Sequence, residues 1–106
     1  MSNLNKETIL SKVDSYQILN FYLLPYHNEN NLLAAKNISN PLLPEKQETP
    51  SFNIFPTMST GEWRYKDFAT GDEGSCFDLV MNLFNLSFIE SLEKIHSDLL
   101  FDTLVV

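Results

Sequence analysis

Four consecutive residues combine two aromatic rings with two positive charges: Trp63, Arg64, Tyr65 and Lys66. Because side chains alternate along a β-strand, the two rings would share one face and the two cations the other. Rings that stack unpaired bases and cations that contact phosphates are the means by which single-strand binders hold nucleic acid. The same pattern fits a strand whose rings belong to the core and whose cations are solvated, and the sequence leaves both interpretations open.

The distribution of charge favours the middle of the chain for any contact with phosphate. The net charge is −7, but residues 34–66 carry four cations against three acids, whereas residues 67–106 carry one lysine against eight acids. So few cations predict modest, salt-sensitive binding. The candidate nucleic-acid-binding residues are Lys36, Lys46, Trp63, Arg64, Tyr65 and Lys66.

Groups suited to catalysis or metal binding are sparse. Cys76 is the single cysteine, and His27 and His96 stand far apart with no partner cysteine. The acids near the middle of the chain form no Asp-x-Asp pair of the kind expected at a phosphoryl-transfer metal site. We therefore expect no catalytic residues and no disulfide in this chain.

The elements that must position these residues follow from the hydrophobic periodicity. Apolar spacing predicts one helix over 6–24 or two short helices meeting near Asp14. Residues 32–39 fit a strand or a helix, and their β-branched end and the following Asn-Pro favour a strand. A hairpin with strands 51–56 and 63–69 turns through Gly61, with Phe52 and Ile54 facing the core.

Two helices should close the domain, over 75–85 and 87–99. Ser75 and Ser87 are their predicted N-caps, each answered by an acid three residues later. The last residues, 101–106, resemble the start of a strand or a linker. Helix, hairpin, helix, helix is the order of an α+β domain. No apolar run reaches the roughly 20 residues that span a bilayer, and no signal peptide is evident, so we expect a cytoplasmic protein without membrane contact.

Three pieces of sequence resemble the N-terminal zinc-binding domain, a zinc ribbon, of bacterial- and phage-type DNA primases. They are "TPSFNIFP" (49–56), "YKDFATGDEGSCFDLVM" (65–81) and "LSFIESLEKI" (86–95). Their order and spacing match over residues 40–97, and "DSYQILNFYL" (14–23) is similar to the helix that precedes this domain in phage and mobile-element primases. The resemblance implies a single domain over 1–106, with 1–33 as a helical extension.

The resemblance also implies where zinc ligands would stand. Asp67 and Thr70 occupy the positions of the second pair of cysteines, and the first pair would fall within 40–45, which reads Asn, Pro, Leu, Leu, Pro, Glu. Structural zinc needs four nitrogen or sulfur ligands. We therefore expect a degenerate, zinc-free ribbon in which apolar burial replaces the metal, with contributions from Phe52, Ile54, Trp63, Tyr65 and Phe68.

By this resemblance the chain is expected to be a non-catalytic template-recognition module of a primase-like replication protein. It would bind single-stranded DNA weakly, with Trp63, Tyr65 or Phe55 stacking a base, and would work beside a primase catalytic domain or a helicase. The alternative is an acidic protein-interaction module on the same scaffold. Its acids over 72–102 would dock on a basic partner such as a helicase or another nucleic-acid enzyme.

Overall fold

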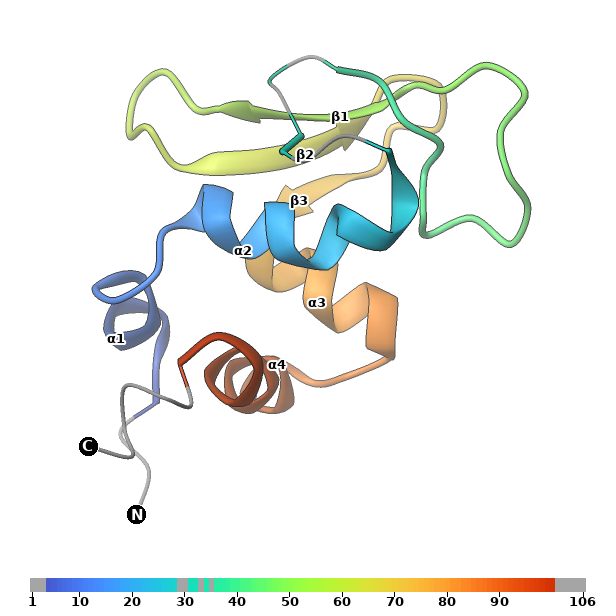
Figure 1. Ribbon diagram of the computed structural model, residues 1–106. Coiled ribbons are helices and arrows are strands. Elements are labelled where there is room, and N and C mark those ends of the chain that lie inside the picture. The colour runs from blue at the N-terminus through green and yellow to red at the C-terminus, as the bar shows by residue number, and fades with distance from the viewer. Residues whose placement is uncertain (1–3, 29–30, 33, 35, 101–106) are drawn as a thin grey trace.

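The computed structural model describes residues 4–28, 31–32, 34 and 36–100. Its elements are α1 (Lys6–Leu10), α2 (Ser15–Leu23), the 3₁₀ turn η1 (Leu24–Tyr26), β1 (Phe52–Pro56), β2 (Trp63–Asp67), β3 (Glu73–Ser75), α3 (Cys76–Phe84), α4 (Phe88–Ile95) and the π-helical turn η2 (His96–Leu100). The sheet forms one layer, and the helices lie together on one side of it (Figure 1). The α+β class expected from the sequence is confirmed.

The sheet contains one strand more than the expected hairpin. Its order is β1-β2-β3 with both pairs antiparallel, and Gly61 in the β1–β2 turn has a φ of 77°, a conformation that glycine adopts without steric cost. β3 is unexpected because its three residues, Glu-Gly-Ser, have low strand propensity. Close packing explains the glycine: a Cβ atom on Gly74 would lie 2.7 Å from Cβ of Asp78.

The N-terminal helical segment is divided into two short helices. The side chain of Asp14 accepts a hydrogen bond from the backbone N–H of Gln17, and the side chain of Gln17 accepts one from the N–H of Asp14. This reciprocal cap satisfies two of the amide groups that a helix start leaves without partners. Of the two arrangements that the periodicity allowed, two short helices is therefore the one observed.

Both C-terminal helices begin at their predicted caps. Ser75 accepts from the N–H of Asp78 at 3.2 Å, and Ser87 accepts from the N–H of Glu90 at 3.1 Å. The buried side of α3 includes Leu79, which is fully buried, whereas Phe84 near its C-terminal end is 44% exposed. α3 contacts α2, α4 and β2, and at its C-terminal end the ring of Phe84 contacts the ring of Tyr22 at 5.8 Å and Nζ of Lys94 at 4.4 Å.

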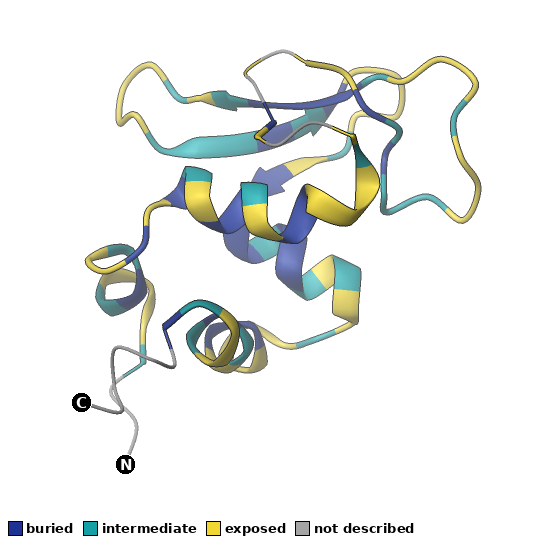
Figure 2. Ribbon diagram, in the orientation of Figure 1, coloured by how far each residue is buried: buried dark blue, intermediate teal, exposed yellow. Residues whose placement is uncertain are grey.

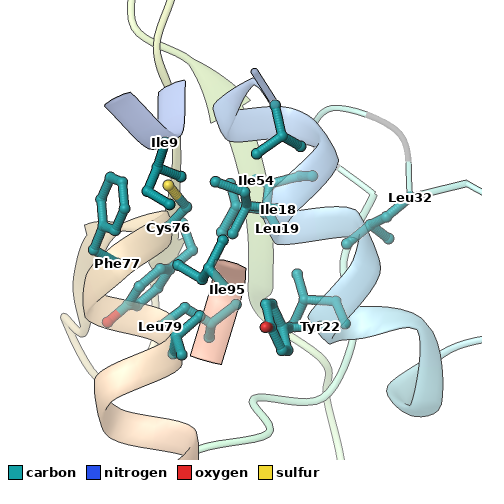
Figure 3. Packing of buried hydrophobic residues seen from close by; sticks show 14 of the residues in the cluster. Ile9, Ile18, Leu19, Tyr22, Leu32, Ile54, Cys76, Phe77, Leu79 and Ile95 are labelled. Carbon is teal, nitrogen blue, oxygen red and sulfur yellow. The ribbon is translucent and has the colours of Figure 1, made fainter. Parts of the chain in front are cut away.

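One apolar core joins the sheet to the helices. The largest fully buried side chains come from all parts of the fold: Ile9, Ile18, Leu19, Leu23, Leu32, Phe52, Ile54, Tyr65, Phe77, Leu79, Leu92 and Ile95. In Figure 3, Ile9, Ile18 and Cys76 point into the same interior from three different helices, and Figure 2 shows buried stretches in the strands and in the helices beneath them. Ile9, Ile18, Leu19, Leu23 and Leu32 show that the segment 1–33 contributes apolar side chains to this core.

The expected strand over 32–39 is largely wrong. Among its described residues, ladder pairing is confined to a bridge between Ile38 and Phe52. The expectation for residues 101–106 lies outside the described residues. No helix in the described part of the chain is long and apolar enough to cross a membrane.

Candidate nucleic-acid interface

The sheet has two chemically different faces. Ile54 pairs with Tyr65, and both are buried against the helices. One residue along, Phe55 pairs with Arg64, so these two side chains lie on the face directed away from the helices. The predicted separation of rings from cations on β2 is confirmed.

The face away from the helices carries both cations of β2 and two aromatic rings. We call it the open face and define it by Phe55, Arg64, Lys66 and Phe68. Nζ of Lys66 lies 5.2 Å from the centre of the Phe68 ring, within the range of a cation–π contact. Phe68 is 65% exposed, and the other three side chains are partly exposed. The open face thus offers rings and positive charge to solvent together.

Two of the three rings expected to stack bases, Trp63 and Tyr65, lie on the helix-covered side of the sheet. Tyr65 is only 2% exposed and stacks on Phe52 with ring centres 5.3 Å apart, so its assignment as a base-stacking residue is wrong. Trp63 lies on the helix-covered side, where its ring packs against Tyr16 at 4.8 Å. Both rings are covered because the helices present apolar surface to this side of the sheet. Burying an aromatic ring against that surface stabilises the fold.

Phe68 was expected in the core and lies instead on the open face. The signal was present in the sequence: counting by two from Arg64 and Lys66 reaches Phe68, so strand alternation places it with the cations. Phe55, on β1, is the other ring on this face and was named from the sequence as a stacking residue.

The two remaining lysines lie in different surroundings. Lys36 is exposed and precedes Asn37, whose side chain accepts a hydrogen bond from the Asn53 amide at 2.9 Å. Asn53 pairs with Lys66 across the sheet, so the segment carrying Lys36 lies beside the open face. Lys46 is exposed on the loop after Asn40, and no contact places it on the open face.

The two segments that the resemblance equates with the zinc ligands lie next to each other, but neither carries a cysteine or a histidine. The carboxylate of Asp67 accepts from Nδ2 of Asn40 at 2.8 Å, although 27 residues separate them. Thr70 is exposed, and its hydroxyl accepts from the N–H of Asp72 at 3.2 Å. Within the described residues no group of three or more His, Cys, Asp or Glu side chains could hold a metal ion.

The one cysteine is poorly placed to act as a nucleophile. Cys76 is fully buried, and this burial, with the carboxylate of Glu62 adding to it, raises the pKa of the thiol to about 12. The thiolate is the reactive form of cysteine, so little of it exists near neutral pH.

Two hollows lie on the surface of the described residues. One of about 370 Å³ is lined by Leu42, Tyr65, Asp72, Glu73 and Asn82, and its two carboxylates disfavour an anionic ligand. The other, of about 420 Å³, lies between residues 25–28 and 39–46 and includes Lys46. Neither contains Arg64 or Lys66.

Comparisons with protein-family models, with curated proteins and with solved structures found no match to this chain. The geometry of its own residues is therefore the basis for assigning a function.

Proposed function

We propose that this chain is a non-catalytic template-recognition module of a primase-like replication protein, and that its open face binds single-stranded DNA. The observation that carries the proposal is the placement of Arg64 and Lys66 beside exposed rings on the sheet face away from the helices. Single-strand binders combine positive charge along the backbone path with rings on which bases stack.

The expected affinity is low. Arg64, Lys66 and the neighbouring Lys36 are few, and Glu73 pairs with Lys66 across β2 and β3 on the same face. The acidic C-terminal third of the chain also repels the negatively charged DNA. Binding by two or three cations is weak at physiological salt and suits a module that reads template while a neighbouring catalytic part holds it.

The hydrogen bond between Asn40 and Asp67 supports the resemblance to the primase domain. The resemblance equates the loop near 40–45 and the turn after β2 with the two halves of a zinc site. In this chain a direct hydrogen bond joins these two segments. Under this proposal, polymerisation is carried out by a separate catalytic domain, and the module works beside that domain or a helicase. Such a module works in the cytoplasm.

The test is an anisotropy titration of a labelled oligothymidylate at two salt concentrations. Replacing Arg64 and Lys66 together by alanine should weaken binding about thirtyfold at low salt, since each phosphate contact in water is worth about 1 kcal/mol and about 1.4 kcal/mol corresponds to tenfold in affinity. The salt dependence should fall as well, by about 0.7 in logarithmic slope for each phosphate that the variant no longer neutralises.

The matched control replaces Lys6 and Lys12, two exposed lysines of the N-terminal segment, by alanine. It changes the net charge equally but leaves the open face intact. Equal weakening of binding in the two double variants would show a nonspecific charge effect and would refute the proposed site.

A second candidate function is docking on a basic protein. α4 begins with Phe88 and Ile89, which are 42% and 59% exposed, and these apolar side chains are followed by the exposed acids Glu90 and Glu93. Such a surface combines apolar area with negative charge. Partner binding would then respond to charge reversal at Glu90 and Glu93 and be unaffected by the removal of Arg64 and Lys66.

A further inference from the structure

Asp67 is a buried carboxylate at the end of β2. It is 0% exposed, and neutral hydrogen-bond donors surround it in place of charged partners. Its oxygens accept from the hydroxyl of Ser51, from Nδ2 of Asn40 at 2.8 Å, from Nε2 of Gln47 at 3.0 Å and from the N–H of Ala69 at 2.9 Å. An ionised carboxyl has about four acceptor sites, so these donors match its capacity.

The donors come from two segments that are far apart in the chain. Ala69 belongs to the turn that follows β2, whereas Asn40, Gln47 and Ser51 belong to the segment before β1. That segment is irregular, so regular ladder bonds do little to hold it in place.

Hydrogen bonds within the irregular segment also hold the donor side chains of Asn40 and Gln47 in place. The side chain of Gln47 accepts from the N–H of Asn40 at 2.8 Å, and the N–H of Gln47 donates to Ser39 at 2.8 Å. The side-chain oxygen of Asn40 accepts from the N–H of Leu42 at 2.8 Å. Asn40 and Gln47 are thereby oriented with both amide groups directed at Asp67.

We infer that the Asp67 carboxylate is an anionic clamp that fixes residues 39–51 to the turn after β2, the task that a structural metal ion performs in other small domains. The clamp goes beyond the proposed function because it holds whether or not the open face binds nucleic acid. Its energy comes from hydrogen bonds to a charged acceptor in a site shielded from water, which are stronger than bonds between neutral groups.

The charge on Asp67 is what organises the donors. Burial alone would raise the pKa of this carboxyl, but the hydrogen bonds from Ser51, Asn40 and the backbone N–H groups of Ala69 and Thr70 outweigh it and lower the pKa to about 2. Asp72 is the other charged group at the cluster, and it shares Nδ2 of Asn40 at 3.2 Å. A lowered pKa means that the clamp is intact above the ordinary aspartate range and is lost as the pH falls toward 2.

The test compares Asp67→Asn with Asp72→Asn by hydrogen exchange of backbone amides, followed by mass spectrometry. Both variants remove one negative charge from a carboxylate that accepts from Nδ2 of Asn40. Asp67→Asn places an NH₂ group against the donors, so exchange in 39–51 and 67–72 should rise about tenfold or more, the consequence of losing hydrogen bonds to a charged group. Peptides from α3 and α4 should change little, and Asp72→Asn should leave the loop close to the unaltered protein. Unchanged exchange of residues 39–51 in Asp67→Asn would overturn the clamp.

A second measurement keeps the inference testable if Asp67→Asn does not fold. In the unaltered protein, nuclear magnetic resonance can follow the side-chain amide signals of Asn40 and Gln47 as the pH is lowered. The clamp predicts that both signals change together with a midpoint near 2. A midpoint in the ordinary aspartate range would contradict it. So would faster exchange of residues 39–51 after addition of a chelator, because that result would show a bound metal in its place.

Discussion

At the scale of single residues, alternation along β2 decides which groups reach solvent. The cations Arg64 and Lys66 could be placed opposite Trp63 and Tyr65 from the sequence, because the period of a strand is two. Which face the helices cover could not be read in the same way. That choice depends on the total apolar area of each face, and Phe52, Ile54 and Tyr65 together make one side the core.

Tyr65 on β2 and Phe68 in the turn after it have different roles, and truncating each side chain to alanine tests them. Tyr65→Ala should lower the free energy of unfolding by about 3–5 kcal/mol, the usual cost of removing a buried aromatic side chain. Phe68→Ala should change it by no more than about 0.5 kcal/mol, because its ring is mostly exposed.

The same two variants separate stability from binding. Phe68→Ala should weaken the binding of oligothymidylate, since stacking on a ring contributes about 1–3 kcal/mol per base. Chemical denaturation and anisotropy measure the two effects independently. A large drop in stability in Phe68→Ala would show that its ring belongs to the core after all.

At the scale of elements, local signals predicted helices better than strands. Each of α2, α3 and α4 begins at a side chain that closes a reciprocal cap within four residues, and such caps can be read directly from the sequence. β3 could not be read, because its pairing with β2 rather than its own propensity makes it a strand. The segment 32–39 shows the reverse, since its apolar residues fit a strand but, among the residues described there, pairing is limited to Ile38.

The cap of α4 gives a prediction at this scale. Ser87→Ala removes the acceptor for the N–H of Glu90 and should lower the free energy of unfolding by about 1 kcal/mol. Ser59→Ala, in the exposed β1–β2 turn, is the matched control and should stay within about 0.5 kcal/mol. Thermal unfolding followed by circular dichroism compares them, and equal effects would show that the cap does not stabilise α4.

At the scale of the whole molecule, the helices cover one face of the sheet and leave the other open (Figure 1). The class of the fold and the order of its helices and its hairpin were predictable, because they follow from hydrophobic periodicity and turn residues. The meeting of Asn40 with Asp67 was not, because a hydrogen bond between residues 27 apart depends on how the finished layers bring the loops together. The resemblance to the primase domain drew attention to both regions. Because this sequence lacks the zinc ligands, the resemblance did not predict which interaction joins them.

The negative charge of the whole molecule makes the open face the expected place for nucleic acid to bind. A chain with a net charge of −7 still places two cations side by side on the sheet face that the helices do not cover. If nucleic acid binds, the acidic helices should stay away from it and the sheet should approach it. The charge distribution therefore predicts where binding occurs as well as how strong it is.

The most direct measurement is a titration of isotope-labelled protein with a short oligothymidylate, followed amide by amide by nuclear magnetic resonance. We predict that the shifts concentrate in residues 53–55, 64–68 and 36–37, which form or border the open face. The amides of α4 should stay unchanged and serve as the internal control. Shifts that instead centre on α4, or none at millimolar DNA and low salt, would contradict single-strand binding by the open face.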